Sequence, residues 1–258
     1  GKTIAVVTRE EGSGTRDAFT ELTGVLVKDG DTKTDKTTSS AVTINSTEAV
    51  ITNVKDNDAA IGYISLGSLN DTVKAVKIGS VEVNAENVKS GDYAISRPFN
   101  IAYKGELSEV AQDFVDYILS SDGQAVVSEE GYVSVSESAA YSGKKPEGKI
   151  SVAGSSSVAP VMEKLAEAYQ KINTNAKVEI QTSDSSAGMQ AAMEGTCDIG
   201  MASRELKDEE AGSLESITIA KDGIAIIVNK ANNCDDLTVD QIRTIYTGET
   251  TVWSDVIK

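Results

Sequence analysis

The sequence contains no histidine among its 258 residues. Histidine is the usual general base near neutral pH and the commonest zinc ligand, so its absence excludes enzymes built on Ser-His-Asp or Cys-His groups. Cysteine is nearly as scarce, since only Cys197 and Cys234 are present. Two distant cysteines do not resemble a zinc site, and they fit either one disulfide or two buried thiols. We therefore expect neither a metal site nor a cofactor.

Long apolar runs and an excess of basic charge are also missing. No stretch approaches the ~20 consecutive apolar residues of a transmembrane helix, and no signal peptide is recognisable. With 40 acidic and 24 basic residues the formal net charge is −16, so long-range repulsion argues against nucleic acid or an anionic membrane as a partner. The chain begins with Gly1 rather than methionine, which suits either processing of a precursor or an excised piece of a longer sequence. We therefore expect a soluble chain or a mature exported one whose leader is absent.

What the sequence does contain is an alternation of strand-like and helix-like segments, in a chain long enough for two lobes. The predicted strands are 4–7, 60–64, 73–78, 93–103 and 224–228, with others near Ile150, Val178 and Ile199. The predicted helices include 15–22, 46–54, 107–120, 161–169 and 239–246. This alternation indicates α/β layers with largely parallel sheets. Residues 28–40 are predicted to form a solvated loop, 137–148 a linker, and 207–210 a solvated helix face.

A loop rich in glycine and hydroxyl groups follows the first predicted strand. Residues 9–15, Arg-Glu-Glu-Gly-Ser-Gly-Thr, lead into a predicted helix start. The first N–H groups of a helix lack intrahelical partners and the helix dipole places partial positive charge there, so this junction can stabilise a phosphate-sized oxyanion. Ser13 and Thr15 add hydroxyl donors. Gly14 allows close approach to the backbone, and Arg9 offers a planar pair of donors.

Two further strand-to-helix junctions carry residues of the same kind. Residues 153–160 read Ala-Gly-Ser-Ser-Ser-Val-Ala-Pro, and residues 183–188 read Ser-Asp-Ser-Ser-Ala-Gly. Each serine cluster alone is more typical of a helix N-cap than of a ligand site. Three such junctions without a bulky side chain at the turn favour a shared oxyanion site. In a chain this acidic, local dipoles and hydrogen bonds rather than a broad positive surface would hold the anion.

These loops resemble one known family, the phosphate-binding receptors of bacterial Pst-type ABC transporters. The matching segments are residues 9–15, 153–160, 185–188 and 198–204, with further landmarks at 60–63, 245–248 and Trp253. The resemblance covers nearly the whole chain. It implies an α/β, two-lobed class II periplasmic-binding-protein fold with the ligand cleft between the lobes. It also implies a monomeric receptor, not an enzyme, that binds inorganic phosphate with high affinity and delivers it to ABC permease subunits.

The order of the segments differs from that of the family. There the Ala-Gly-Ser loop comes near the N-terminus and the Arg-x-x-Gly-Ser-Gly-Thr loop follows well after it, whereas here the latter opens the chain. Joining Lys258 to Gly1 produces uninterrupted family-like sequence, so we expect a circularly permuted chain in which residues 141–148 form the new connection. Permutation is tolerated where chain ends lie close together at the surface. The sequence does not distinguish a natural permutation from an engineered one, and a unit cut from a tandem array would have the same sequence.

The resemblance also sets the expected lobe boundaries. The chain should cross between lobes near residues 93–98 and again near residues 219–224. Lobe I would then be continuous over residues 93–224 and would include the linker. Lobe II would be discontinuous, combining residues 1–92 with residues 225–258, and would carry the loop that contains Arg9.

The implied phosphate-binding residues come from both lobes. They are Ser156, Ser157, Ser185 and Ser203 from lobe I, and Arg9, Ser13, Gly14 and Thr15 from lobe II. Hydroxyl and backbone N–H groups would surround the anion, Arg9 would supply the charge-assisted pair, and closure of the lobes would exclude water. In relatives an acidic residue at the position of Glu11 orients the arginine. A solvated loop carboxylate is an equally open interpretation of Glu11.

The selectivity of this site depends on a hydrogen-bond acceptor. Phosphate keeps a proton near neutral pH that sulfate lacks, so an acceptor in the site favours phosphate. The best-known relatives use an aspartate where this sequence has Ser203. The Ser203 hydroxyl, Asp184 or Glu205 could accept instead, while Arg204 would add attraction for any anion, and the sequence does not choose among them. We expect phosphate to be preferred over sulfate.

Other functions share some of these features. A receptor for sulfate or molybdate would use the same fold, and a permuted receptor would also suit an engineered phosphate sensor. An enzyme acting on phosphate esters is less well supported, because the sequence has no Gly-x-x-x-x-Gly-Lys-Ser/Thr loop and no clear carboxylate cluster at the junctions. In its native setting the receptor is expected to be exported, as a periplasmic protein or a cell-surface lipoprotein.

Overall fold

The computed structural model describes residues 1–257, so Lys258, which ends the expected lobe II range 225–258, lies outside the described residues. These residues group into two compact units. Unit 1 combines Gly1–Ser96 with the segment from Gly223 onward, and unit 2 is Arg97–Asp222. The chain therefore passes from one unit to the other twice, after Ser96 and after Asp222.

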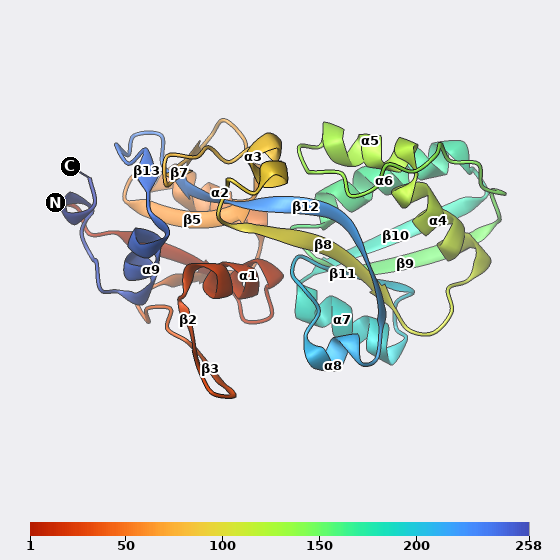
Figure 1. Cartoon of the computed structure of the whole chain (residues 1–258), viewed down its shortest axis with the longest axis horizontal. Coiled ribbons are helices and arrows are strands. Elements are labelled where there is room, and N and C mark those ends of the chain that lie inside the picture. The colour runs from red at the N-terminus through yellow and green to blue at the C-terminus, as the bar shows by residue number, and fades with distance from the viewer. Residues whose placement is uncertain (258) are drawn as a thin grey trace. The chain divides into compact units, whose positions relative to one another are not determined.

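Unit 2 is a mixed sheet with helices on both faces (Figure 1). The strand order is β10 (Ala176–Ser183), β9 (Gly148–Ser155), β11 (Ile199–Ala202), β8 (Ser96–Tyr103) and the first part of β12 (Glu215–Val228). The helices are α4 (Glu109–Leu119), α5 (Ser121–Glu129), α6 (Ala159–Ile172), α7 (Ser185–Glu194) and α8 (Asp208–Ala211). β9 pairs in parallel with β10 and β11, whereas β8 is antiparallel to β11.

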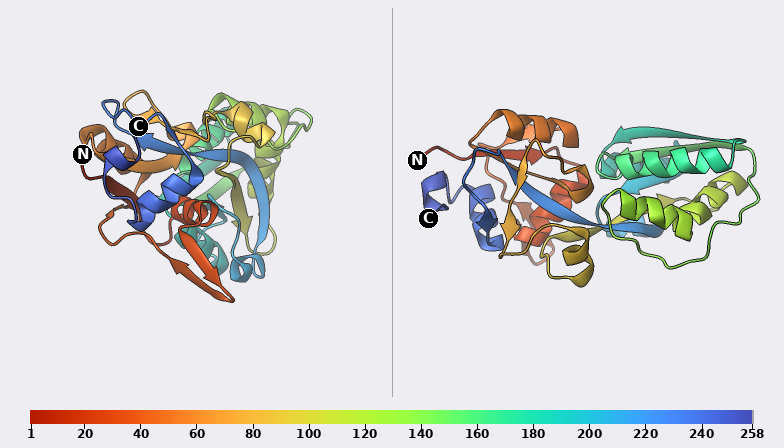
Figure 2. Two further views of the ribbon diagram at one scale, coloured as in Figure 1. Left: turned by 60° about the vertical axis from the view of Figure 1, so that its left-hand side comes forward. Right: turned by 90° about the horizontal axis from the view of Figure 1, so that it is seen from above.

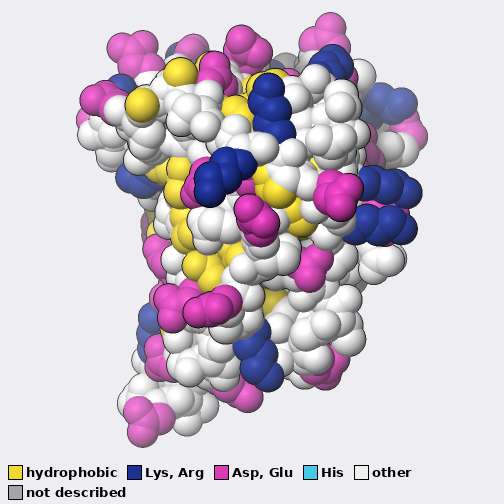
Figure 3. Space-filling model, turned by 90° about the vertical axis from the view of Figure 1, so that its right-hand side faces the viewer, with side chains coloured by type: hydrophobic (Ala, Val, Ile, Leu, Met, Phe, Trp, Pro, Cys, Tyr) yellow, Lys and Arg dark blue, Asp and Glu magenta, His cyan; other side chains and the backbone are white. Residues whose placement is uncertain are grey.

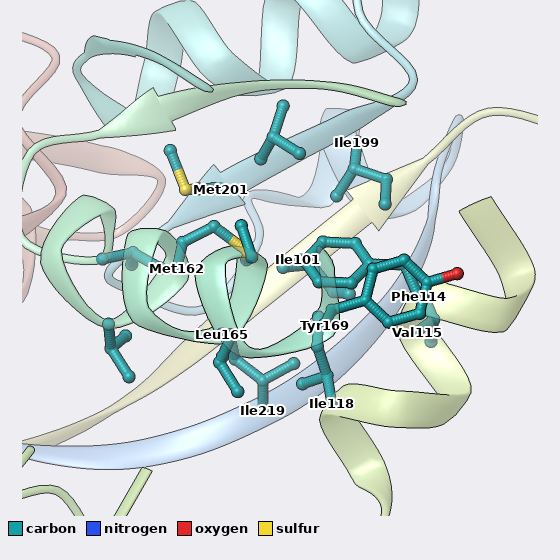
Figure 4. Packing of buried hydrophobic residues seen from close by; sticks show 14 of the residues in the cluster. Ile101, Phe114, Val115, Ile118, Met162, Leu165, Tyr169, Ile199, Met201 and Ile219 are labelled. Carbon is teal, nitrogen blue, oxygen red and sulfur yellow. The ribbon is translucent and has the colours of Figure 1, made fainter. Parts of the chain in front are cut away.

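Unit 2 has a layer of helices on each face of the sheet because apolar side chains of its strands point to both faces. Successive residues of a strand point to opposite faces of the sheet. Val152 belongs to a large cluster with apolar residues of α4 and α6, whereas its neighbour Ala153 packs in a smaller cluster with α7. Figure 4 shows the large cluster, in which Leu165 of α6 and Ile118 of α4 are close-packed side chains. Small alanines on the second face allow α7 to approach the sheet closely.

Unit 1 is built on the rest of the same nine-stranded sheet, in the order last part of β12, β5 (Ala60–Ser65), β1 (Ala5–Arg9) and β4 (Val42–Ile44). Its helices are α1 (Gly14–Thr23), α2 (Thr47–Asp56), α3 (Ala85–Ser90) and α9 (Val239–Thr247), with short 3-10 turns η1 (Leu66–Ser68) and η2 (Trp253–Asp255). Further short strands are β6 (Lys74–Ala75), β7 (Lys77–Ile78), β13 (Asp236–Leu237), and the hairpin of β2 (Leu26–Asp29) and β3 (Thr32–Asp35). Figures 1 and 2 show this hairpin projecting from unit 1.

The two faces of the unit 1 sheet are covered by different helices. Ile64 packs in a cluster with Val50 and Val54 of α2. The adjacent Tyr63 lies on the other face, where its ring stacks on Phe19 of α1 with the centroids 4.0 Å apart. The pattern again follows from the two-residue period of a strand.

Several expectations from the sequence are corrected by the structure. The predicted solvated loop 28–40 contains most of the β2–β3 hairpin, because two polar strands can pair through their backbones around Gly30, whose φ of 60° suits a tight turn. The sheets are mixed rather than largely parallel, since β12 runs antiparallel to β5. The predicted strand 73–78 is divided into β6 and β7, and the predicted strand 93–103 begins only at Ser96.

The cysteine alternatives are resolved in favour of two free thiols. Cys197 lies in unit 2 and Cys234 in unit 1, and both are buried. Burial raises the pKa of the Cys234 thiol to about 11. Burial also raises the pKa of the Cys197 thiol, so neither thiol is a reactive thiolate near neutral pH. No helix within residues 1–257 is long and apolar enough to cross a membrane.

Candidate functional site

The loop after β1 has the predicted strand–loop–helix form. Arg9 is the last residue of β1, and Ser13 caps α1, since its Oγ accepts a hydrogen bond from the N–H of Arg16 at 3.2 Å. Gly12 has a φ of 93°, in the left-handed region that glycine adopts without strain. The Ser13 and Thr15 side chains are buried, each with 1% of its surface exposed. Buried hydroxyls at a helix start fit an anion site that excludes water.

Arg9 is held in place by the neighbouring Glu10. Its Nε donates to Glu10 Oε1 at 2.8 Å and its Nη2 donates to Oε2 at 3.4 Å, while only 2% of Arg9 is exposed. The Nη1 of Arg16 donates to the carbonyl oxygen of Arg9 at 2.6 Å. Glu11 is exposed, which agrees with the solvated interpretation of this residue. Glu10, which the sequence analysis did not single out, is the carboxylate that orients Arg9.

A buried tyrosine supports this loop from behind. The Tyr63 hydroxyl lies 2.8 Å from Thr8 Oγ1 and accepts a hydrogen bond from the N–H of Arg9 at 3.3 Å. Burial raises the pKa of Tyr63 to about 12, so the hydroxyl stays neutral and keeps its donor proton. The end of β1 is thereby tied to the core of unit 1.

In unit 2, the first loop is organised by a serine that the sequence analysis did not include among the site residues. Ser155 ends β9, and its Oγ accepts hydrogen bonds from the N–H groups of Ser157 and Val158 at 3.2 and 3.3 Å. Ser157 is buried and Ser156 is half-buried. Because Ser155 satisfies two N–H groups at the start of α6, it shapes the turn that presents Ser156. Its position directly before the predicted serines was the available signal.

The second and third loops of unit 2 meet through their serines. Ser185 is the first residue of α7, and its Oγ accepts a hydrogen bond from the N–H of Ser203 at 3.0 Å. The two hydroxyl oxygens are 3.3 Å apart, and both residues are almost completely buried. Asp184 caps α7, since its Oδ1 accepts from the N–H of Ala187 at 2.8 Å. Two segments that the sequence analysis identified separately thus form one hydroxyl pair.

The three loops of unit 2 leave the same edge of the sheet. β9, β10 and β11 are parallel neighbours, with Ser155 opposite Ser183 and Gly154 opposite Met201. Gly154 has a φ of 137°, and a Cβ there would lie 2.3 Å from the Met201 carbonyl oxygen. A Cβ on Gly188 of α7 would lie 2.6 Å from the Cα of Gly154. These two glycines let the start of α7 approach the strand ends.

Arg204 forms a buried ion pair beside this edge. Its Nη1 and Nη2 donate to Glu210 Oε1 and Oε2 at 2.6 and 3.0 Å, and Nη2 also lies 3.3 Å from Ser186 Oγ. Burial pushes the pKa of Glu210 upward, but hydrogen bonds from Arg204 and from the Lys207 N–H outweigh it, so the pKa lies below its usual value. The prediction that residues 207–210 form a solvated face is wrong for Glu210, which is 6% exposed.

A second buried arginine reaches the same loop. Arg97 pairs with Asp222 through Nε and Oδ2 at 3.0 Å, and its Nη1 donates to the Ser203 carbonyl oxygen at 3.1 Å. The sequence does not predict this pair, because nothing in the spacing of residues 97 and 222 relates them. Within residues 1–257, no group of three or more Cys, Asp or Glu side chains is placed to hold a metal ion.

The predicted site residues therefore fall into two sets. Ser156, Ser157, Ser185 and Ser203 lie at one sheet edge of unit 2, and Arg9, Ser13, Gly14 and Thr15 lie at the start of α1 in unit 1. Each set combines helix-start N–H groups with hydroxyls, and the unit 1 set adds a guanidinium. Donors of this kind stabilise a small oxyanion.

Comparison with known proteins defines the class. A family model of the PBP superfamily domain matches residues 1–122 and 139–258. The chain is also similar to a solved structure, a phosphate-binding protein of a phosphate ABC transporter from Streptococcus pneumoniae TIGR4. The TM-score is 0.79 at 46% identity, over 99% of this chain and 100% of that one. The predicted α/β, two-lobed periplasmic-binding-protein fold is confirmed.

Sequence relatives narrow the class further. The chain is 52% identical over 260 residues to the phosphate-binding protein PstS 2 of Streptococcus agalactiae serotype V, which covers 99% of this chain and 88% of that protein. A phosphate-binding protein PstS from Staphylococcus saprophyticus is 39% identical over 120 residues, 43% of this chain and 38% of that protein. The chain belongs to the PstS family of phosphate-binding proteins. These relatives are named as binding proteins, in agreement with the expectation that the chain is not an enzyme.

Proposed function

We propose that this protein binds inorganic phosphate with loops from both units and delivers it to the permease of an ABC transporter. The observation that carries the proposal is the meeting of Ser185 and Ser203 at a buried helix start, in a chain related along nearly its whole length to phosphate-binding proteins. Buried hydroxyls cost free energy unless they are hydrogen-bonded. A tetrahedral oxyanion offers acceptors for several of them at once.

Each of the eight predicted residues has a role in this proposal. From unit 2, Ser156 offers its hydroxyl and N–H groups, Ser157 its N–H and Ser185 its hydroxyl, while the Ser203 N–H is engaged by Ser185 and its hydroxyl remains for the ligand. From unit 1, Ser13 offers its hydroxyl, and Gly14 and Thr15 offer N–H and O–H groups. Arg9 supplies the charge-assisted pair, and Glu10 presets its guanidinium plane before the anion arrives. Closure of the two lobes around the anion would remove water and strengthen every one of these contacts.

We propose that the Ser203 hydroxyl accepts the proton of hydrogen phosphate. Asp184 is engaged as the α7 cap, and Glu205 is exposed. Ser203 Oγ lies 3.3 Å from Ser185 Oγ, so it can donate its own proton there and accept one from the ligand. A hydroxyl can also act as a donor, so discrimination against sulfate should be weaker than with a carboxylate at this position.

We further propose that the chain is a natural circular permutant whose units correspond to lobe I, residues 93–224, and lobe II, residues 1–92 with 225–258. The alignment with the Streptococcus agalactiae protein runs along 99% of the chain, which supports the same order of loops in that natural protein. The Staphylococcus saprophyticus protein aligns over only 43% of the chain. Two proteins related by circular permutation are expected to align over only part of their length, because the exchanged segments stand in opposite order and one collinear alignment covers only one of them.

The setting of the protein belongs to the same proposal. We infer an exported, periplasmic or lipid-anchored receptor that acts as a monomer and does not bind nucleic acid. The net charge of −16 supports the last point. Figure 3 shows acidic side chains spread over one face, with basic side chains among them rather than in one continuous patch.

Calorimetric titration of the full chain with phosphate, sulfate and molybdate tests the function. We expect phosphate to bind most tightly and to raise the thermal unfolding midpoint, because a ligand that binds only the folded form stabilises it. Comparable affinity for phosphate and sulfate would show a general oxyanion receptor. Metal-dependent release of phosphate from a chromogenic ester would indicate an enzyme instead.

Two substitutions locate the site. Arg9→Ala should weaken phosphate binding by roughly 1.5–3 kcal/mol, the value of a hydrogen bond to a charged group. Gly14→Val should block approach of the anion to the backbone at the start of α1. Unchanged affinity in both variants would place the phosphate elsewhere.

A further inference from the structure

We propose that Arg97, fixed by Asp222, is a positioning residue that sets the geometry of Ser203 in the anion site. The inference rests on the phosphate-binding function proposed above, but it concerns two residues outside the donor set. Neither residue lies in the loops that resemble the family motifs. Both lie on the strands that connect the two units.

The first observation is the burial of both charges. The side chains of Arg97 and Asp222 are 1% and 0% exposed, and Nε lies 3.0 Å from Oδ2. The guanidinium also lies over the ring of Phe99, with 5.4 Å between Cζ and the ring centroid. Removing two charges from water costs several kcal/mol per ion, so a buried pair is often no more stable than an apolar pair of similar size. The location of this pair therefore suggests a role beyond stability.

The second observation is what the guanidinium does with its remaining donors. While Nε engages Asp222, Nη1 donates to the Ser203 carbonyl oxygen at 3.1 Å. The planar guanidinium presents these donors in a fixed geometry. Asp222 therefore sets the orientation of Arg97, and Arg97 sets the position of the Ser203 carbonyl group.

The third observation links this carbonyl group to the site. The N–H of Ser203 donates to Ser185 Oγ at 3.0 Å. Ser203 is thus held on both sides, by Arg97 through its carbonyl oxygen and by Ser185 through its amide. With both backbone groups fixed, the Ser203 hydroxyl is confined near the Ser185 hydroxyl, 3.3 Å away. A donor or acceptor set that is held in place before the ligand arrives binds more tightly than one that must be ordered on binding.

The pair also occupies a defined place in the fold. Arg97 and Asp222 are the first and last residues of unit 2. The ion pair therefore joins the two points at which the chain passes between the units. In the proposal, the same contact fixes both this crossing and the carbonyl group of Ser203.

The first test needs no ligand. In the Arg97→Met/Asp222→Leu variant of the full chain, both charges are replaced by apolar side chains, which should keep the thermal unfolding midpoint close to that of the unmodified protein. We expect the Ser203 amide to exchange with solvent about tenfold faster, because residue 203 loses the contact that holds it from its carbonyl side and its N–H then leaves Ser185 Oγ more often. The Val152 amide in β9 serves as the internal control and should be unchanged. Unchanged exchange at Ser203 would overturn the proposal.

The second test uses phosphate. In the same double variant, the phosphate Kd should rise about tenfold, whereas Arg243→Met/Asp240→Leu, which replaces an exposed Arg–Asp pair in α9, should leave it unchanged. Arg97→Lys should give an intermediate Kd, because an ammonium group lacks the fixed fork. If Arg97 acts through Ser203 and Ser185, the double substitution should have much less effect in a Ser185→Ala background. Fully additive effects would show that the pair does not act through these serines.

Amide exchange and phosphate titration distinguish failure of the positioning role of Arg97 from failure of phosphate binding. Failure of the unmodified protein to bind phosphate would overturn the proposed function, while exchange at Ser203 would still decide whether Arg97 positions it. If the double variant instead loses stability and affinity together, and Arg97→Lys restores neither, the pair is structural and the positioning proposal fails.

Discussion

The ring of Tyr63 stacks on the ring of Phe19, with centroids 4.0 Å and planes 10° apart, and its hydroxyl lies 2.8 Å from Thr8 Oγ1. Tyr246 completes the cluster, with its ring edge toward Phe19 at 4.7 Å. The hydroxyl of Tyr63 also accepts the N–H of Arg9. The aromatic core of unit 1 is thereby connected directly to the loop that carries the candidate anion donors.

Replacing Tyr63 with phenylalanine should weaken this connection without disturbing the stacked ring. Thr8 and the Arg9 N–H would lose a buried partner, which costs about 1–3 kcal/mol. We expect a loss of this size in the free energy of unfolding measured with urea, and a smaller loss in phosphate affinity. A Thr8→Val/Tyr63→Phe double variant should lose less than the sum of the two single variants. A fully additive result would contradict the hydrogen bond.

The same tyrosine should make the protein sensitive to alkaline pH. Burial raises the pKa of Tyr63 to about 12 from a usual value of 10.0, so folding favours the neutral form. Its contribution to stability is fully present below pH 10 and is lost as the pH rises through about 12. Tyr63→Phe should therefore show a shallower fall in stability over this range, measured by urea unfolding at several pH values. Tyr246, whose pKa burial also raises, should account for part of the remaining fall. If the free energy of unfolding fell equally steeply with pH in the variant and in the unmodified protein, Tyr63 would not be the source of the alkaline sensitivity.

Glu10 and Glu11 provide a matched comparison at the Arg9 loop. Glu10→Gln removes the charge that fixes Arg9, so the guanidinium must be ordered when the anion binds. We expect phosphate affinity to fall by about 1 kcal/mol. Glu11→Gln removes the same charge from an exposed neighbour and should change affinity little. Calorimetry on the two variants at low and high salt separates two effects on phosphate affinity: the orientation of the Arg9 guanidinium, and the long-range repulsion between a carboxylate and the anion. Salt screens only the long-range repulsion. A larger effect of Glu11→Gln would mean that Glu11, and not Glu10, orients the guanidinium for binding.

The Arg204–Glu210 pair should govern stability in acid. Glu210 titrates below its usual value of 4.5, since the Arg204 and Lys207 hydrogen bonds outweigh its burial. The contribution of Glu210 to the free energy of unfolding is therefore present above pH 4.5 and is lost as the pH falls through the lowered pKa. Glu210→Gln should flatten this acid limb and should destabilise the fold at neutral pH by about 3 kcal/mol, because Arg204 would be left buried without its carboxylate. Thermal unfolding across this pH range measures both effects. An Arg204→Met/Glu210→Leu variant should recover most of the loss, and no recovery would mean that the pair has a further role.

The local structure of the candidate site could be predicted from the sequence because its signals are local. A strand followed by glycine and hydroxyl residues and then a helix start is written in consecutive positions, as in residues 9–15. The segments that resemble the family motifs are also short and continuous. The hairpin of β2 and β3 was missed for the opposite reason, since its polar strands lack the alternating pattern that predicts a strand.

The partners of charged groups could not be predicted in this way. The choice of Glu10 over Glu11 depends on which side chain can turn toward a buried guanidinium. Glu210 lies in an acidic run that predicts a solvated helix face, but it is buried because Arg204 pairs with it. The sequence alone therefore overestimates how many of these charges are exposed.

The sequence by itself determined the chemistry of this protein: no histidine, only two cysteines, strongly acidic charge, and three predicted helix starts rich in hydroxyl groups. Only the tertiary structure decided which groups act together. Ser185 meets Ser203, and Arg97 meets Asp222 across 125 positions of the chain. Local sequence fixes caps and turns because their hydrogen bonds join near neighbours. Contacts between distant residues form only when strands pair and layers pack, and no local pattern specifies which pairs are brought together.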